Sequence, residues 1–430
     1  MISSRSLVAA AVAVGLAIRS DAGAQSAPAT TATAASAQSQ PATSAAPFTA
    51  GWQDGFIMQS ANGDYRLAIG LVAQMDGRFP LDEPTPIVNT FTVRKVRPTF
   101  SGRLARYFDF KVMPDFGNGA AVVQDAYFDI RFSPAIRVRT GKDKTPIGYE
   151  LLIGDAFVLF PERSIASSLV PNRDIGVQVQ GDLAGGRVFY GAGVFNGVPD
   201  GSSTTTELDT NNGKDLAGRI VMQPFRAAAS SAPAGPLAGL GFQLGGSTGR
   251  QTGALPSFRT SVGQSYFSYA GTIADGDRRR VSPAVFYYYK AFGVFAEYMR
   301  SSQSVTKGGI GTDVTNDAWN VTGSYVLTGE NGADRGVRPN ANFDPPTGGW
   351  GAFQIVARYA ELHLDDDIFA RGLAAAGANR QAQSFTVGAN WYPVSIIKYY
   401  ATFERTVFDG DADGARPAED VILFRAQVAF

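Results

Sequence analysis

Arginine and lysine at alternate positions are the residues of this 430-residue sequence best suited to a chemical role. In an extended strand, residues two apart project from the same face, so this spacing places several charges side by side. Arginine stays ionised and presents its donors in a fixed fork, which suits the binding of oxyanions. The basic residues that share one face of the strands predicted below are Lys95, Arg97, Arg103, Arg131, Arg137, Arg139 and Arg219.

Other kinds of chemistry have few residues to draw on. The absence of cysteine excludes disulfides, thiolate zinc sites and cysteine nucleophiles. His363 is the single histidine, and it reads as a surface loop residue rather than a catalytic base. Basic and acidic residues balance at 38 each, so no overall charge indicates a nucleic-acid partner. We therefore expect no metal site, no cofactor and no nucleic acid.

The first 50 residues differ in composition from the rest of the chain. Arg5, an apolar run over residues 7–18 and a small-residue site at residues 22–24 predict a signal peptide over residues 1–24. Residues 25–50 are almost entirely Ala, Ser, Thr, Gln and Pro, which predicts a disordered spacer. The composition and the pattern of alternating segments are uniform over residues 51–430, so we expect one exported domain.

That domain consists of segments of about ten residues in which apolar and polar side chains alternate. In the last segment, Ile422, Phe424, Val428 and Phe430 share one face, and such segments number about sixteen. Clusters rich in Gly, Asn, Asp and Pro separate them. The short gaps, typical of tight turns, are residues 105–108, 133–135, 183–186 and 290–292. The long gaps, typical of loops, are residues 142–173, 196–213, 329–349, 362–380 and 409–419.

This pattern predicts an all-β fold, either a soluble sandwich or a transmembrane antiparallel β-barrel with its apolar face toward lipid. The export signal, the aromatic residues near strand ends and the C-terminal Phe430 favour the barrel. A closed barrel requires the last strand to pair with the first, near residues 65–74. Polar side chains would then line a watery interior.

The basic residues named above would face this interior. At about 4 Å and an effective dielectric near 20, one charge contributes roughly 4 kcal/mol to holding an anion. Several moderate sites in series would attract an anion and still release it. Asp125, Asp129, Glu297 and Glu404 share the inward face, so the cations could instead pair with carboxylates and brace a polar wall. The sequence leaves both interpretations open.

Four phrases within residues 92–197 resemble a known family: TVRKVRPTFSGRLARYFDFKVMPDFG, DAYFDIRFSPAIRVRTGKDKTPIGYE, FPERSIASSLVPNRDIGVQVQG and VFYGAGVFNG. Together they resemble the phosphate-selective porin O and P family, whose members show DFDFK, KTPFG, LERS, GRDIGVQ and AAGVFNG. The sequence has IGYE where FGLE is usual and PNRDIG where PGRDIG is common. The resemblance covers most of the N-terminal half and, more loosely, the strand rhythm of the remainder.

The resemblance implies a sixteen-stranded, homotrimeric porin of the Gram-negative outer membrane, surrounded by its lipid. In that family the third long loop folds into the barrel and forms the constriction. Carried over, this loop is residues 142–173, and its basic residues Lys142, Lys144 and Arg163 would line the constriction. Resemblance to bacterial barrels in general implies that the barrel-assembly machinery recognises the C-terminal Phe430.

Two loops carry weaker signals. Asp409, Asp411, Asp413 and Asp420 have a calcium-loop spacing, but Pro417 and the lack of flanking helices favour a polar hairpin loop over a cation site. The aspartates after His363 could cap a short helix over residues 368–376 that ends at Gly377.

These features predict passive diffusion of small solutes without enzymatic turnover, with a preference for anions such as phosphate or polyphosphate. A general or sugar-permeable pore with a mixed-charge interior is the alternative within transport. A lipid hydrolase built on a barrel is the alternative of another class. It would need a nucleophile beside His363, and the surrounding YAELHLDD supplies none.

Overall fold

The computed structural model describes residues 48–81, 88–204, 209, 211–227, 235–409 and 416–430. The chain divides into two units, Met1–Ala45 and Ala46–Phe430, and every described residue belongs to the second. The predicted signal peptide and most of the predicted spacer lie outside the described residues, as do Asp411 and Asp413 of the acidic loop. In the part that is described, no helix has the length and hydrophobicity needed to span a bilayer.

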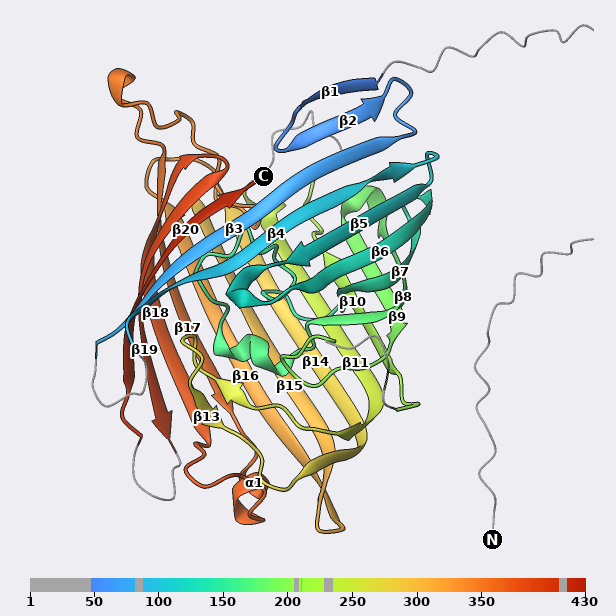
Figure 1. Ribbon diagram of the computed structural model, residues 1–430, viewed down its shortest axis with the longest axis vertical. Helices are drawn as coiled ribbons and strands as arrows, with labels where there is room; N and C mark the ends of the chain where they lie inside the picture. Colours follow the sequence, from blue (N-terminus) through green and yellow to red (C-terminus); the bar gives the residue numbers. More distant parts are fainter. Residues whose placement is uncertain (1–47, 82–87, 205–208, 210, 228–234, 410–415) are drawn as a thin grey trace, which may run out of the picture. The chain divides into compact units, whose positions relative to one another are not determined.

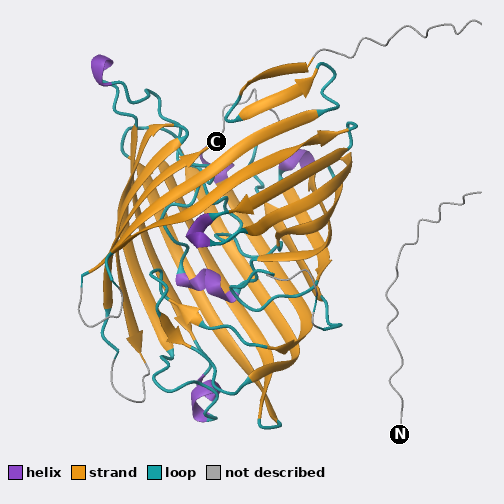
Figure 2. Ribbon diagram, viewed as in Figure 1, coloured by secondary structure: helices purple, strands orange, loops and turns teal. Residues whose placement is uncertain are grey.

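Sixteen antiparallel strands form a closed barrel (Figures 1 and 2). Each strand pairs with the strands before and after it, and the last pairs with the first. The predicted all-β barrel of about sixteen strands is therefore confirmed. The barrel strands are β3 (Arg66–Pro80), β4 (Thr90–Leu104), β5 (Phe108–Asp115), β6 (Val122–Ser133), β7 (Ile136–Lys144), β8 (Arg173–Leu183), β9 (Val188–Phe195), β10 (Asp215–Met222), β11 (Leu240–Gly253), β14 (Ile273–Tyr289), β15 (Phe292–Lys307), β16 (Ile310–Val326), β17 (Ala352–His363), β18 (Gln381–Val394), β19 (Ile397–Asp409) and β20 (Glu419–Ala429).

The seam of the barrel lies between β20 and the second half of β3. β20 pairs with residues 72–80, from Ala429 opposite Val72 to Val421 opposite Pro80, so the pairing overlaps only the end of the predicted range, residues 65–74. The first half of β3 pairs with β2 (Phe56–Ser60), which forms a hairpin with β1 (Phe48–Trp52). Because β1 begins inside the predicted spacer, the end of that segment forms a strand.

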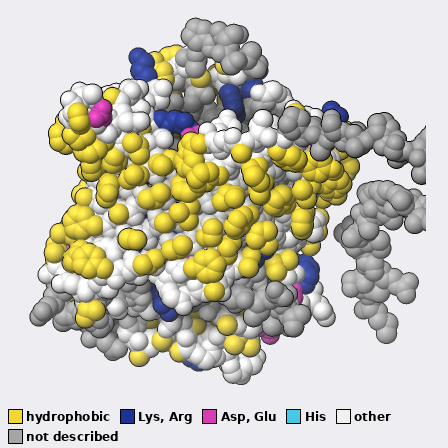
Figure 3. All heavy atoms as spheres, turned by 45° about the horizontal axis from the view of Figure 1, so that its top comes forward, with side chains coloured by type: hydrophobic (Ala, Val, Ile, Leu, Met, Phe, Trp, Pro, Cys, Tyr) yellow, Lys and Arg dark blue, Asp and Glu magenta, His cyan; other side chains and the backbone are white. Residues whose placement is uncertain are grey.

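Side chains alternate between an apolar outer face and a polar inner face. On β6, Phe128 is 63% exposed and the adjacent Asp129 only 3% exposed. On β20, Phe424 is 47% exposed and Arg425 only 2% exposed. Hydrophobic side chains cover much of the outer surface seen in Figure 3. A soluble sandwich would bury this apolar face, so the arrangement is that of a membrane barrel.

Most short turns lie at one end of the barrel and most long loops at the other. Short turns follow β4, β6, β8, β14 and β18 at the end where the C-terminus lies (Figure 1), here called the turn end. Ala105 and Arg106, in the turn after β4, have the positive φ angles (46° and 68°) that tight hairpin turns use. The long connection over residues 327–351 follows β16 and also lies at the turn end, because antiparallel strands alternate in direction. The predicted loop 329–349 therefore does not join the other long loops.

Strand length varies around the barrel. β5, β9 and β10 have 8 residues and β7 has 9, whereas β14 and β16 have 17. The helix after β17 is shorter than predicted: α1 spans Asp366–Ala370 and is capped by Asp365, whose carboxylate accepts the Asp367 N–H at 2.9 Å. His363 is the last residue of β17 rather than a loop residue.

Candidate functional site

The segment between β7 and β8, residues 145–172, crosses the inside of the barrel and is called the inner loop below. Inward side chains from four strands donate to its backbone carbonyls. The donors are Gln74 on β3 to Asp155 (3.3 Å), Asn390 on β18 to Leu159 (3.0 Å), Lys398 on β19 to Val158 (2.8 Å) and Gln427 on β20 to Ala156 (2.9 Å). A polar wall therefore holds a loop whose carbonyls would otherwise lack partners.

Two buried glutamates fix the two ends of the inner loop. Glu297 on β15 accepts the N–H groups of Tyr149 (2.5 Å) and Glu150 (3.0 Å). Glu150 itself accepts from the Ser164 hydroxyl (2.5 Å) and from Arg358 on β17 (3.3 Å). These bonds join the loop to itself and to the wall formed by β15 and β17.

A buried apolar cluster fills part of the interior on the same side. It contains the helical turn η2 (Ile165–Leu169) of the inner loop and the hairpin β12 (Phe258–Arg259) and β13 (Ser265–Phe267), which follows β11. The wall residues in this cluster are Met299, Val305, Val314, Ala318, Ala360, Leu362 and Ala382. Open space therefore remains mainly on the side of β4 to β10.

Two cavities lie on that side, and they meet at the inner loop. One, of about 400 Å³, extends toward β9 and β10 and is lined by Phe189 and Arg219. The other, of about 750 Å³, extends toward the long-loop end. Arg97, Asp155 and Arg173 line both cavities. These three residues mark the junction between the two spaces.

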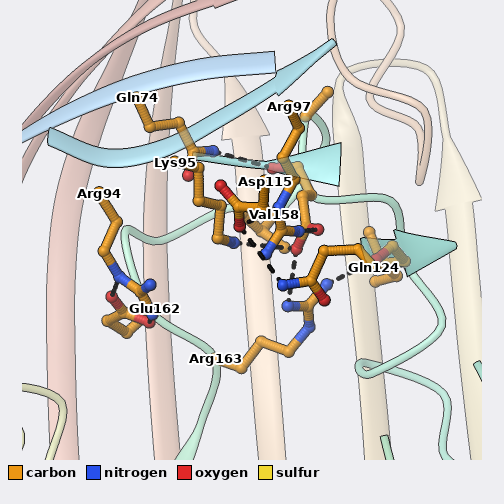
Figure 4. Close-up of polar contacts among 12 residues, drawn as sticks. Gln74, Arg94, Lys95, Arg97, Asp115, Gln124, Val158, Glu162 and Arg163 are labelled. Atoms are coloured by element: carbon orange, nitrogen blue, oxygen red, sulfur yellow. Dashed lines mark hydrogen bonds and ion pairs between the residues drawn. The ribbon is translucent and has the colours of Figure 1, made fainter. Parts of the chain in front are cut away.

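A cluster of charges occupies this junction (Figure 4). Asp155 of the inner loop accepts from Lys95 at 3.0 Å and from Arg163 at 2.9 Å, and it also pairs with Arg97. Arg173 on β8 approaches the same carboxylate at 3.8 Å. In Figure 4, Lys95 and Arg97 point from β4 toward Arg163 on the loop. One loop carboxylate therefore lies among four basic side chains.

The local charges control the protonation of the inner loop. Burial alone would raise the pKa of Asp155, but Lys95, Arg163 and Lys144 outweigh it and hold that pKa well below its usual range. Burial likewise opposes ionisation of Glu162, yet Arg94 at 2.7 Å lowers the pKa of Glu162 to about 2. Both carboxylates are therefore ionised at neutral pH.

The model of one family, phosphate-selective porin O and P, matches residues 69–430, nearly the whole described barrel. The chain belongs to this family. The prediction made from the sequence motifs is confirmed, and with it an outer-membrane channel rather than an enzyme. No curated protein matches the sequence.

Solved porins share the fold at low sequence identity. The outer-membrane channel DcaP of Acinetobacter baumannii superposes with a TM-score of 0.56 at 13% identity, covering 86% of this chain and 99% of that one. The anion-selective porin from Comamonas acidovorans gives 0.52 at 12% identity, covering 85% and 100%. The trimer form of OmpT from Vibrio cholerae gives 0.51 at 12% identity, covering 85% and 99%.

In this porin the predicted basic residues occupy several different regions. Lys95, Arg97 and Arg163 meet at the junction described above. Arg139 lines the smaller cavity, holds Asp129 through two bonds of 2.7 Å, and lies 3.6 Å above the ring of Tyr127. These four predicted residues therefore lie beside the open space.

Arg103, Arg131 and Arg137 lie near the turn end instead, away from the inner loop. Arg103 pairs with Asp109 at 3.0 Å, and Arg131 donates to the Arg106 carbonyl at 2.8 Å. Arg137 pairs with Asp182 at 3.6 Å. None of the three lines the two cavities of the described structure.

Lys142 and Lys144 belong to β7, because the strand runs two residues past the predicted start of the loop. Lys142 lies opposite Ala126 and Ile175 and donates to the Thr204 carbonyl at 2.9 Å. Lys144 lies inside, where the carbonyls of Leu151 (2.5 Å) and Ile153 (3.1 Å) of the inner loop bind its ammonium group. Lys142 therefore binds the connection that follows β9, and Lys144 holds the inner loop.

Arg219 is the predicted residue with the fewest partners. Its guanidinium lies 4.8 Å from the ring centre of Phe189 and donates weakly to Gln243 at 3.4 Å. Within the described residues it forms no ion pair, and its Nε has no hydrogen-bond partner. It lines the smaller cavity.

Sequence reasoning missed the carboxylates that organise the site. Asp155, Glu150 and Glu162 all come from the inner loop, which the motifs located but whose path across the barrel they do not encode. Arg94 was missed for a different reason. A β-bulge beside Lys95 turns both residues inward, and a strict alternation assigns Arg94 to the lipid face.

Proposed function

We propose that this porin conducts small anions in preference to cations, by passive diffusion along the two cavities beside the inner loop. The observation that carries the proposal is the excess of basic side chains around both spaces. The larger cavity is lined by two carboxylates and seven basic residues: Arg78, Arg94, Lys95, Arg97, Arg163, Arg173 and Arg259. The smaller is lined by three carboxylates and six basic residues: Arg97, Lys111, Arg139, Lys144, Arg173 and Arg219.

The ion pairs moderate this excess without removing it. Asp125 accepts from both Lys111 and Arg173 at 2.7 Å, so one carboxylate is the ion-pair partner of two basic side chains. Asp155 is shared in the same way among Lys95, Arg97 and Arg163. Shared carboxylates leave net positive potential while weakening each site, which favours entry and release of an anion over tight binding.

A pore for neutral solutes is the second candidate, because most inward cations have a carboxylate partner and because Val72, Met113, Pro146 and Leu152 add apolar surface to the smaller cavity. A solute without charge would not require the excess of basic residues. We therefore place this candidate after anion conduction.

We also propose that the porin assembles as a homotrimer through the side that carries β5, β7, β9 and β10. A strand of 8 residues tilted by about 45° covers roughly 19 Å, less than the apolar band of about 25 Å in outer-membrane barrels. Its outward side chains are nevertheless apolar, as at Val112 and Val194. A neighbouring subunit would cover the apolar outer surface of these short strands. Among the solved structures of similar fold, OmpT of Vibrio cholerae has a trimer form.

Reversal potentials in a planar bilayer under a potassium chloride gradient test the anion preference. We expect the wild type to favour chloride and Arg219→Gln to lower the ratio of anion to cation permeability. Arg405→Gln is the matched control, because Arg405 lies on the outer face with 53% of its side chain exposed. A cation-selective wild type, or equal changes in both variants, would overturn the proposal.

Trimer formation is tested by measuring the mass of the assembled porin. The mass of the detergent-solubilised porin should be that of three chains, and Val112→Asp should reduce it to that of one. A monomeric wild type would contradict the assembly proposal and leave anion conduction standing.

A further inference from the structure

The outer wall of the barrel contains an apolar groove of about 630 Å³ beside the seam. It extends over β17, β18, β19, β20, β3 and β4, so it lies on both sides of the pairing between the last strand and the first. The large side chains along it are Met75, Phe91, Phe353, Trp391, Tyr399 and Phe424. Asp76 and Arg425, the charged residues of the wall at this place, turn inward with 3% and 0% of their side chains exposed. Among the described residues, no charged side chain therefore faces the groove.

Three alanines form the floor of the groove. Ala389 on β18 lies opposite Ala401 on β19, and Ala426 follows on β20. The strand pairing places a large side chain beside two of them, with Phe424 opposite Ala401 and Tyr399 opposite Ala426. Small side chains between large ones produce the depression, and its surface is therefore aliphatic along the floor and mainly aromatic along the sides.

The length of the strands at the groove indicates that lipid, rather than another subunit, covers it. β20 has 11 residues, and at a tilt of about 45° such a strand covers roughly 26 Å, enough for the apolar band of about 25 Å in outer-membrane barrels. The neighbouring strands are longer still, with 15 residues in β3 and 14 in β18. This wall therefore crosses the whole band, unlike the strands of 8 residues that we assign to the subunit interface.

Within the membrane, hydrocarbon is the material that fits this groove. A bound water needs polar partners, which the alanine floor does not offer. An empty groove would lose the dispersion contacts that its lining atoms make when the space is filled. Because lipid chains and apolar side chains are equally apolar, a chain gains no hydrophobic free energy there and is held by van der Waals packing. The shape of the groove therefore determines how well a chain is held.

Tyr399 marks the end of the groove at which the polar part of a lipid would lie. It is the third residue of β19, close to the turn end, and it is 44% exposed. The adjacent Trp391 donates its indole N–H to the Trp350 carbonyl at 2.7 Å, whereas the Tyr399 hydroxyl has no hydrogen-bond partner among the described residues. Tyr and Trp side chains are typical of the boundary between membrane and water. The hydroxyl is therefore free to donate to an ester or phosphate oxygen.

We propose that the groove binds one acyl chain of a phospholipid from the leaflet at the turn end, with the Tyr399 hydroxyl donating to the polar part of the same molecule. The proposal is independent of anion conduction. A chain in the groove contacts β19, β20 and β3 together, so the bound lipid packs across the seam and stabilises the closed barrel.

Native mass spectrometry of the porin, released from detergent micelles that contain phosphatidylethanolamine, counts the lipids that remain bound. Ala401→Phe fills the floor of the groove, and we expect it to bind the lipid about fivefold more weakly than the wild type, because packing contacts with the chain are lost. Tyr399→Phe keeps the ring and removes the hydroxyl, so its loss should be smaller. Ala357→Phe is the matched control, because Ala357 is exposed on the outer face of β17, opposite Gly323 and Val387, and does not line the groove.

Equal lipid binding by Ala401→Phe, Ala357→Phe and the wild type would overturn the inference, because lipid would then bind anywhere on the wall. Tighter binding of lipid A than of phosphatidylethanolamine, lost in Ala401→Phe, would overturn the assignment to a phospholipid. A smaller assembly mass in Ala401→Phe would also overturn the inference, because the groove would then be a subunit contact. If Ala401→Phe does not fold, Tyr399→Phe decides: weaker binding supports the proposal and unchanged binding contradicts it. Anion selectivity is measured separately, so this failure differs from failure of the proposed function.

Discussion

Replacing Arg425 with methionine should strongly destabilise the barrel, although the substitution conserves much of the side-chain volume. Arg425 lies on β20 with no exposed side-chain surface. It donates to both oxygens of Asp76 at 2.6 and 2.8 Å and also to the Pro161 carbonyl of the inner loop. The residue therefore joins the two strands at the seam to the loop that crosses the interior.

The magnitude follows from what the substitution leaves behind. Removing one partner of a buried ion pair costs about 3–5 kcal/mol, because the other charge stays buried without compensation. Asp76 would keep only the 3.5 Å contact with Arg78, and the Pro161 carbonyl would lose a donor. A loss of about 3 kcal/mol lowers the folding equilibrium constant by more than a factor of about 100.

Urea unfolding in phospholipid vesicles, followed by tryptophan fluorescence, measures this loss. Arg405→Met is the control, because Arg405 pairs with Asp420 at 2.7 Å but its side chain is 53% exposed, where such pairs contribute about 1 kcal/mol or less. The double variant Arg425→Met with Asp76→Leu should recover part of the stability, since no unpaired charge remains. A loss below about 1 kcal/mol in Arg425→Met, or equal losses in both single variants, would refute the reasoning.

Three further predictions concern the inner loop and the seam. Because the pKa of Glu162 is lowered to about 2, its ion pairs persist as the pH falls through the ordinary value of about 4.3 and weaken only toward pH 2. The part of the single-channel conductance that depends on Glu162 should therefore change only below about pH 4. Gly245→Val should displace the start of the loop, because a Cβ there already contacts Ile147 Cα at 3.4 Å and the two methyl groups of valine extend beyond it. Trypsin should then cleave the loop faster than in the wild type. Deletion of Phe430, whose N–H and carbonyl both bond to Leu71, should lower the yield of folded barrel more than the conductance of the molecules that fold; an unchanged yield would contradict this role.

The strands could be predicted from the sequence because the membrane requires apolar side chains and the interior requires polar ones, at alternate positions along each strand. Phe128 and Asp129 are adjacent, yet one meets lipid and the other the interior, and this contrast repeats along β6. Arg97 and Arg139, which the same alternation assigns to the interior, line the smaller cavity. The alternation was not applied to Lys142, because the strand continues two residues past the point where a loop was expected.

The partners of the basic residues could not be predicted in the same way. Asp155 and Lys95 are distant in sequence, and their contact depends on how the inner loop crosses the barrel. No local pattern encodes that path. The inward apolar residues Met299 and Val314 contradict the alternation when β15 and β16 are considered alone, and they make sense only because the hairpin after β11 folds over them.

Because β20 pairs with β3, the barrel can close only after the last strand has been synthesised. Val72 is synthesised much earlier than its partner Ala429, so this edge of β3 stays unpaired until β20 has been made. The hairpin of β1 and β2 occupies the earlier part of that edge and shortens the stretch that waits. An interrupted chain lacking β20 would leave backbone donors and acceptors unpaired on two edges, in a medium that supplies no water to satisfy them. Omitting β20 would therefore leave an open sheet and not a narrower pore.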